Sequence, residues 1–113
     1  MSGAEPRMQD VVHIETLPDG ALDAASEFAL RWLPKLRERI GQHGSIVIIL
    51  PPADIDHTDW RRAVIRDFAR ASAPMRVNLI GGGTDRARAA TLAYLEGAAG
   101  VTGQYLPLTD EST

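Results

Sequence analysis

The chain has 113 residues, of which 44% are hydrophobic and 24% are charged, and its formal net charge is −3. These values are typical of one globular domain, and the acidic balance argues against a strongly basic protein that binds nucleic acid or an anionic membrane. The sequence has no cysteine, which excludes disulfides, thiolate nucleophiles and Cys-ligated zinc. No apolar stretch is long enough to span a bilayer, so we expect a cytoplasmic protein.

The first half of the chain predicts a strand, a long helix and a second strand. A β-branched run marks the strand at 11–14, and turn residues follow at 17–20. The helix at 22–40 contains Pro34, which removes a backbone donor and predicts a kink. The strand at 45–50 is almost continuously apolar, as in parallel strands that are covered on both faces. Apolar spacing predicts that the inner face of the helix consists of Leu22, Ala25, Ala29, Trp32, Leu33, Leu36 and Ile40.

The second half predicts two more helices, and a strand follows each of them. A helix at 60–71 leads to a strand at 76–80. After a glycine loop, Thr84 or Asp85 is expected to cap the next helix, and the last strand is expected at 104–108. The predicted inner faces of these helices are Trp60, Val64, Phe68 and Ala71 in the first, and Ala87, Thr91, Tyr94, Leu95 and Ala98 in the second.

The order of these elements predicts a small Rossmann-like α/β domain over 11–108. The β-α-β-α-β-α-β pattern is typical of a parallel sheet with right-handed crossovers and helices on both faces. The two ends, 1–10 and 109–113, are small and polar, which predicts flexible termini.

Three segments carry motifs that occur together, in this order, in one known family. Residues 33–39 lead into Gly-Ser-Ile-Val at 44–47, residues 73–83 contain Arg-Val-Asn followed by a glycine loop, and 101–104 read Val-Thr-Gly-Gln. They resemble the later part of the short-chain dehydrogenase/reductase (SDR) family, whose central helix often carries a proline. The resemblance covers about residues 21–108 and implies the C-terminal half of such a fold.

The resemblance also implies sites that this sequence departs from. The family binds its cofactor with a Gly-rich phosphate loop, and nothing before Val11 supplies one. Its catalytic Ser falls near Pro51, and its Tyr-x-x-x-Lys would lie within 53–59, which contains neither residue type. The tyrosines, Tyr94 and Tyr105, are in the last helix and strand. We therefore expect no catalytic residue, no cofactor on the isolated chain, and NAD(P) only through a partner.

An acidic cluster with one imidazole precedes the second helix. Asp54, Asp56, His57 and Asp59 present carboxylate and imidazole ligands that suit a hard cation or zinc. We favour a loop with a helix cap at Asp56 instead, because no second histidine lies at ligand spacing.

The glycine run is a second weak candidate site. Gly81, Gly82, Gly83 and Thr84 follow a strand and open a helix, so their amides suit a phosphate or carboxylate. The segment has neither a P-loop lysine nor Rossmann spacing, which favours a tight strand-to-helix turn.

The interleaving of acids with arginines predicts solvated or interface faces for Arg31, Arg37, Arg39, Arg61, Arg62, Arg66 and Arg70.

The resemblance finally implies an assembly surface. In the family, the helices that match 22–40 and 60–71 lie on one side of the sheet and form a four-helix bundle with another subunit. The matching interface residues are Trp32, Leu36, Trp60, Val64 and Phe68. We expect a non-catalytic SDR-like subunit that forms a homodimer or a heteromer with an SDR-family subunit. The alternatives are an oxidoreductase component that a partner completes, or a diverged small-ligand-binding protein.

Overall fold

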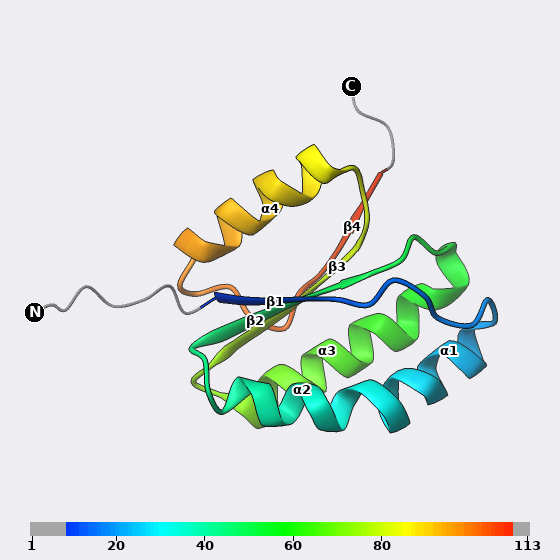
Figure 1. Ribbon diagram of the computed structural model, residues 1–113, viewed down its shortest axis with the longest axis horizontal. Coiled ribbons are helices and arrows are strands. Elements are labelled where there is room, and N and C mark those ends of the chain that lie inside the picture. Colours follow the sequence, from blue (N-terminus) through cyan, green and yellow to red (C-terminus); the bar gives the residue numbers. More distant parts are fainter. Residues whose placement is uncertain (1–8, 110–113) are drawn as a thin grey trace, which may run out of the picture.

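A four-stranded parallel sheet lies at the centre of the structure, a computed structural model that describes residues 9–109 (Figure 1). The strands are hydrogen-bonded in chain order, and they are β1 (Gln9–His13), β2 (Ser45–Leu50), β3 (Arg76–Gly82) and β4 (Tyr105–Leu108). Gln9 and Asp10, which we expected in a flexible end, begin β1. The rest of the predicted flexible N-terminus and residues 110–113 lie outside the described residues.

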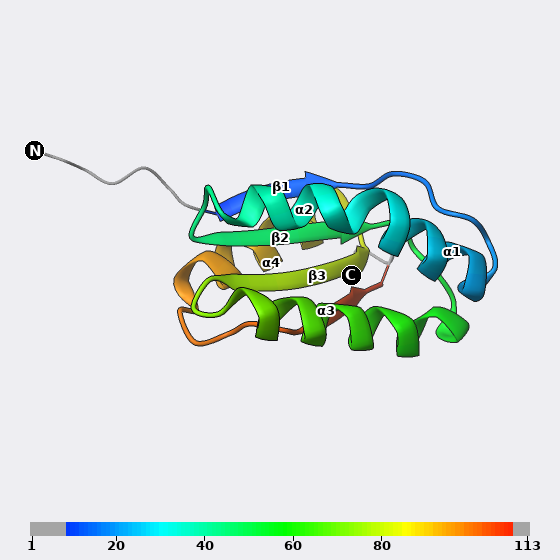
Figure 2. The same cartoon turned by 90° about the horizontal axis from the view of Figure 1, so that it is seen from below.

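Helices cover both faces of the sheet, as the sequence predicts (Figure 2). On one face lies a continuous helical segment formed by α1 (Ala21–Glu27), the π turn η1 (Phe28–Trp32) and α2 (Leu33–Ile40). Beside it lies α3 (Thr58–Ser72), which follows the short 3₁₀ turn η2 (Ile55–His57), and α4 (Asp85–Gly97) covers the opposite face. Within residues 9–109, no helix is long and apolar enough to cross a membrane.

The third crossover has the opposite hand to the first two. Each connection steps along the sheet in the same direction, but the one through α4 passes over the other face. The predicted right-handed crossover is therefore wrong for β3-α4-β4, and such exceptions are rare.

Both faces of β2 are apolar: Ile46, Ile48 and Leu50 pack towards α2 and α3, whereas Val47 and Ile49 pack with Leu95 of α4. The sheet thus separates two hydrophobic clusters.

The π turn shifts the inner face of the first helical segment by one residue. Ala24 and Phe28 are buried instead of the predicted Ala25 and Ala29, and the side chain of Leu22 is 80% exposed. A π turn inserts one residue into the helix, so the positions before it rotate relative to those after it. Pro34, where we predicted a kink, lies in the first turn of α2, where a missing N–H is tolerated, and the π turn ends at Trp32 before it.

Helix α3 also begins and faces differently from the prediction. Oδ1 of Asp54 accepts a hydrogen bond from the N–H of Asp56 (3.1 Å) and caps η2, so the predicted cap at Asp56 is wrong. Ala71, predicted to be inside, is exposed. The buried residues of the helix are Arg61, Ile65, Phe68, Ala69 and Ser72.

Thr84 caps α4, as one of the two predicted caps. Its Oγ1 accepts a hydrogen bond from the N–H of Ala87 (3.1 Å). Leu95 is buried against the sheet as predicted, but Tyr94 is 60% exposed and does not belong to the inner face.

An ion pair joins the start of β1 to the end of α2. Nε and Nη2 of Arg39 donate to the two carboxylate oxygens of Asp10, at 2.7 and 2.8 Å. Nε2 of His43 lies 3.8 Å from the same carboxylate. The hydrogen bonds from Arg39 lower the pKa of the Asp10 carboxyl despite its partial burial.

Replacing Asp10 with asparagine is expected to lower the free energy of unfolding at neutral pH and to make it less dependent on pH in the acidic range. The pKa of Asp10 is lower in the folded chain than in the unfolded chain. The ion pair with Arg39 therefore stabilises the fold above the pKa that Asp10 has in the unfolded chain. This stabilisation is lost as the pH falls through the pKa that Asp10 has in the folded chain. Urea unfolding at about pH 7 and pH 3 measures both effects. Asp23→Asn, at an exposed position of α1, is the control. Equal losses for Asp10→Asn at both pH values would contradict the prediction.

Candidate functional site

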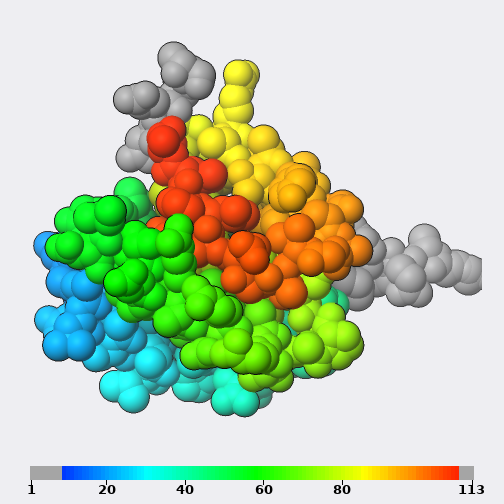
Figure 3. All heavy atoms as spheres, turned by 180° about the vertical axis from the view of Figure 1, so that it is seen from behind, coloured from blue at the N-terminus to red at the C-terminus, as the bar shows by residue number. Residues whose placement is uncertain are grey.

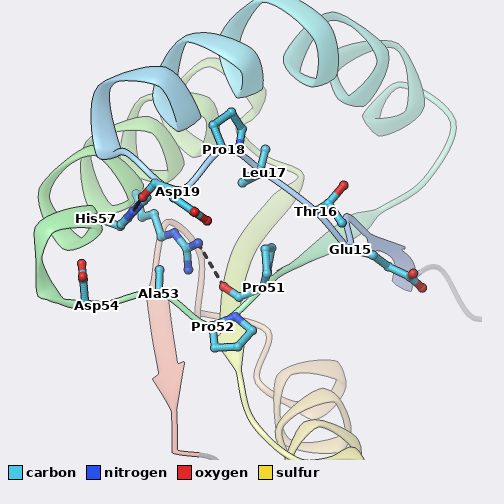
Figure 4. A pocket seen from close by; sticks show the side chains of 11 residues that line it. Glu15, Thr16, Leu17, Pro18, Asp19, Pro51, Pro52, Ala53, Asp54 and His57 are labelled. Carbon is cyan, nitrogen blue, oxygen red and sulfur yellow. Dashed lines mark hydrogen bonds between the residues drawn. The ribbon is translucent and has the colours of Figure 1, made fainter.

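A cavity of about 370 Å³ opens at the carboxyl ends of β1 and β2 (Figure 4). Open parallel sheets bind ligands at the carboxyl ends of their strands, because the loops that follow the strands converge there. Residues 15–19 form one wall and 51–54 form the other, and His57 and Arg61 complete the lining. The site therefore combines the two loops that follow neighbouring strands with the start of α3.

Arg61 is a buried cation in the floor of this cavity. Its side chain is 1% exposed, its Nη2 donates to the carbonyl of Pro51 (3.0 Å) and its Nη1 donates to Oη of Tyr105 (3.2 Å). Its Nε is buried without a hydrogen-bond partner. No carboxylate forms an ion pair with it in the part of the chain that the structure describes. Among residues 9–109, the guanidinium thus has polar neutral neighbours and no counter-ion.

The prediction that Arg61 lies on a solvated or interface face is wrong. Its position, four residues before Ile65 and eight before Ala69, is where the buried stripe of α3 continues. The helical spacing predicts burial at this position, whereas arginine as a residue type predicts exposure. The partners Pro51 and Tyr105 come from other elements, which local patterns do not reveal.

His57 ties the first loop to α3. Its side chain is buried; Nε2 lies 2.8 Å from the carbonyl oxygen of Asp19, and Nδ1 accepts from Nε1 of Trp60 (3.1 Å). Because Nδ1 accepts, Nε2 carries the proton and donates to Asp19. Both ring nitrogens are engaged, so the imidazole positions the loop at 15–19.

The acidic cluster is dispersed into separate structural roles. Asp54 caps η2, His57 uses both nitrogens, and Asp56 and Asp59 are exposed. Across residues 9–109, no group of three or more His, Cys, Asp or Glu is placed to hold a metal ion. Asp54 thus takes the capping role that we predicted for Asp56, and it caps η2 instead of α3.

The glycine segment is partly strand and partly turn. Gly81 and Gly82 belong to β3, and Nη1 of Arg88 donates to the carbonyls of Gly82 (3.2 Å) and Gly83. A Cβ at Gly81 would lie 2.7 Å from Oη of Tyr105 and 2.9 Å from Nη1 of Arg61. The absence of a side chain at Gly81 therefore lets the Arg61–Tyr105 pair pack against β3.

Pro51 occupies the place that the resemblance gives to the catalytic serine. Its carbonyl accepts from Arg61, and the following loop and η2 contain neither tyrosine nor lysine. Tyr105 nevertheless reaches this region from β4 through its bond to Arg61, which we did not predict. The long-range pairing of β4 with β3 brings it there.

A second candidate site is the groove between α2 and α3. It encloses about 280 Å³ and is lined by Leu33, Arg37, Val64, Asp67, Phe68 and Ala71. Of the predicted interface residues, Trp32, Trp60 and Val64 are half-buried, and Phe68 is buried but lines the groove. Leu36 is 1% exposed inside the core, so its prediction as an interface residue is wrong.

The two edges of the sheet differ. Among residues 9–109, no strand pairs with the outer edge of β1, where Val11 is 42% exposed. β4, the other edge, is visible between α3 and α4 in Figure 3 and carries Pro107. Proline blocks strand addition because it lacks an N–H, so β1 is the more open edge.

Comparison with known proteins identifies the family. The family model described as SDR-like, short chain dehydrogenase-like protein, matches residues 12–108. No curated protein and no solved structure gave a significant match. The matched residues include every strand in whole or in part, and the cavity and the α2–α3 groove lie within them. The chain therefore belongs to the SDR-like family of short chain dehydrogenase-like proteins.

Proposed function

We propose that this SDR-like chain is a non-catalytic cytoplasmic subunit that acts through oligomerisation. The groove between α2 and α3 carries the proposal, because the half-buried Leu33 and Val64 and the exposed Ala71 line it on a face that no other described element covers. Pro51 at the expected position of the catalytic serine, together with the lack of tyrosine and lysine in 53–59, supports a role without hydride transfer.

A second copy of the chain fits this groove best. Arg37 on α2 and Asp67 on α3 flank it with opposite charges. A two-fold axis that runs along α2 and α3 places each α2 opposite the partner's α3, so Arg37 faces the partner's Asp67 and the reverse. The half-buried Leu33 and Val64 and the exposed Ala71 then form a shared apolar centre between the two pairs. A full-length NAD(P)-dependent dehydrogenase is the other partner that we consider.

Reversing the charge at Arg37 is expected to weaken the dimer at least about tenfold, which is about 1.4 kcal/mol. Arg37→Glu places like charges opposite each other, whereas Arg37→Glu combined with Asp67→Arg restores complementarity. Asp67 also pairs with Arg70 within its own helix, so the double variant must be compared with Asp67→Arg alone.

Sedimentation velocity over a concentration series measures the dissociation constants. Arg86→Glu makes the same charge change on exposed α4, on the opposite face of the sheet, and should leave the dimer intact. A wild-type monomer at micromolar concentration contradicts the proposal. So does a double variant that is no tighter than Arg37→Glu.

A second candidate function is an oxidoreductase component whose site a partner chain completes. The position of the cavity favours it, because the cavity lies beside the open edge of β1. A strand added at this edge would place its own following loop next to residues 15–19. We propose that NAD(P) is bound only in such a complex, so calorimetry on the isolated chain should detect neither NAD(H) nor NADP(H).

A further inference from the structure

We propose that the cavity at the carboxyl ends of β1 and β2 binds a small zwitterion of the amino-acid type. Its carboxylate pairs with Arg61, and its ammonium group faces the acidic rim of the cavity. This inference does not depend on the proposed dimer, because the cavity and the α2–α3 groove share no residue.

The carboxylate end follows from the state of Arg61. Arginine is rarely buried without an anionic partner, because removing its charge from water is costly. Pro51 and Tyr105 accept hydrogen bonds without neutralising the charge, and each takes only one of the two N–H groups on its Nη atom. The rings of Trp60 and Tyr105, 5.6 and 5.7 Å from the guanidinium carbon, hold it in place. A carboxylate supplies the missing counter-ion and accepts more than one N–H.

The ammonium end follows from the rim. Glu15, Asp19 and Asp54 line the cavity and are exposed; in Figure 4 the side chain of Asp19 extends between the two walls, whereas the carboxylate of Glu15 points outward. These acidic groups at the rim repel a simple anion such as phosphate and attract a cationic group. A ligand that carries both charges satisfies the floor and the rim together.

The size and walls of the cavity restrict the ligand further. Its volume of about 370 Å³ is at the small end of ligand sites. Apolar side chains between floor and rim, from Leu17, Pro18, Pro51 and Ala53, suit a short aliphatic side chain. L-Alanine is therefore a suitable probe, and propionate and ethylamine are matched analogues that each lack one charged group.

NMR titration of the ¹⁵N-labelled chain tests the proposal. L-Alanine should shift the amide signals of 15–19 and 53–57 with a millimolar dissociation constant, and propionate, ethylamine and inorganic phosphate should bind at least tenfold more weakly. Glu15→Gln with Asp19→Asn alters exposed side chains only, and should bring propionate to within about twofold of alanine. Absence of alanine binding, or phosphate or propionate binding as tight as alanine, overturns the proposal.

Arg61→Gln should abolish alanine binding, whereas Arg62→Gln, the same change on the exposed side of α3, should not. If a folded Arg61→Gln variant binds alanine as the wild type does, Arg61 is structural and the proposal is overturned. If Arg61→Gln does not fold, the double variant Glu15→Gln with Asp19→Asn tests the proposal. The proposal is overturned if this variant prefers alanine over propionate as strongly as the wild type does.

Discussion

Replacing Leu36 with alanine is expected to lower the free energy of unfolding by about 2–5 kcal/mol. Leu36 is 1% exposed and packs in the cluster that joins α2 and α3 to the sheet. Its truncation removes buried methyl groups and leaves a cavity that the neighbouring helices and strands fill only in part. Urea unfolding followed by circular dichroism measures the loss.

The same substitution at two exposed leucines is the control. Leu22 and Leu30 are 80% and 81% exposed, because the π turn rotates α1 relative to α2. Leu22→Ala and Leu30→Ala should change stability by less than about 0.5 kcal/mol. A loss at Leu22 comparable with that at Leu36 would mean that the helix is regular and that Leu22 lies inside it.

The second large effect is expected at Gly83, where alanine should destabilise the fold by about 2–4 kcal/mol. The backbone φ of Gly83 is +89°, a conformation that residues with a Cβ rarely adopt. A Cβ there would lie 2.8 Å from both Cβ and Cδ1 of Leu108. The strain and the clash act together at the junction of β3, β4 and α4.

Gly97→Ala tests whether this cost is specific to Gly83. Gly97 ends α4, and a Cβ there would meet no atom within 4 Å. Alanine should leave stability unchanged or raise it by up to about 1 kcal/mol, because it reduces the freedom of the unfolded chain. Thermal unfolding of both variants makes the comparison, and equal melting temperatures would contradict the expected clash.

The element order and the parallel sheet could be predicted from the sequence. The continuous apolar run from Ile46 to Leu50 can be stable only where both faces are covered, and all six residues of β2 are buried. The face that α4 covers could not be predicted in the same way, because a strand that is apolar on both sides accepts a helix on either. The register of α1 was missed because a regular helical period fits the sequence as well as the π turn does.

The candidate site was predictable only in part. The loop around Asp54 was placed correctly after its strand, since local turn signals mark it. The glycine loop was placed too early, because Gly81 and Gly82 still belong to β3. The burial of Arg61 was not predictable from residue type, because it depends on Tyr105 from β4 and on the carbonyl of Pro51. Long-range contacts of this kind decide which side chains meet at a cavity.

The order of strands in the sheet has a consequence for synthesis of the chain. Each strand pairs with the strands immediately before and after it in sequence, so no later strand inserts between two earlier ones. A nascent chain can therefore pair β1 with β2 under the α2 segment while β3 is still being made, at roughly 5–20 residues per second. On the ribosome, the β1 edge is the first part of the sheet available to another polypeptide, before β4 and α4 complete the opposite face.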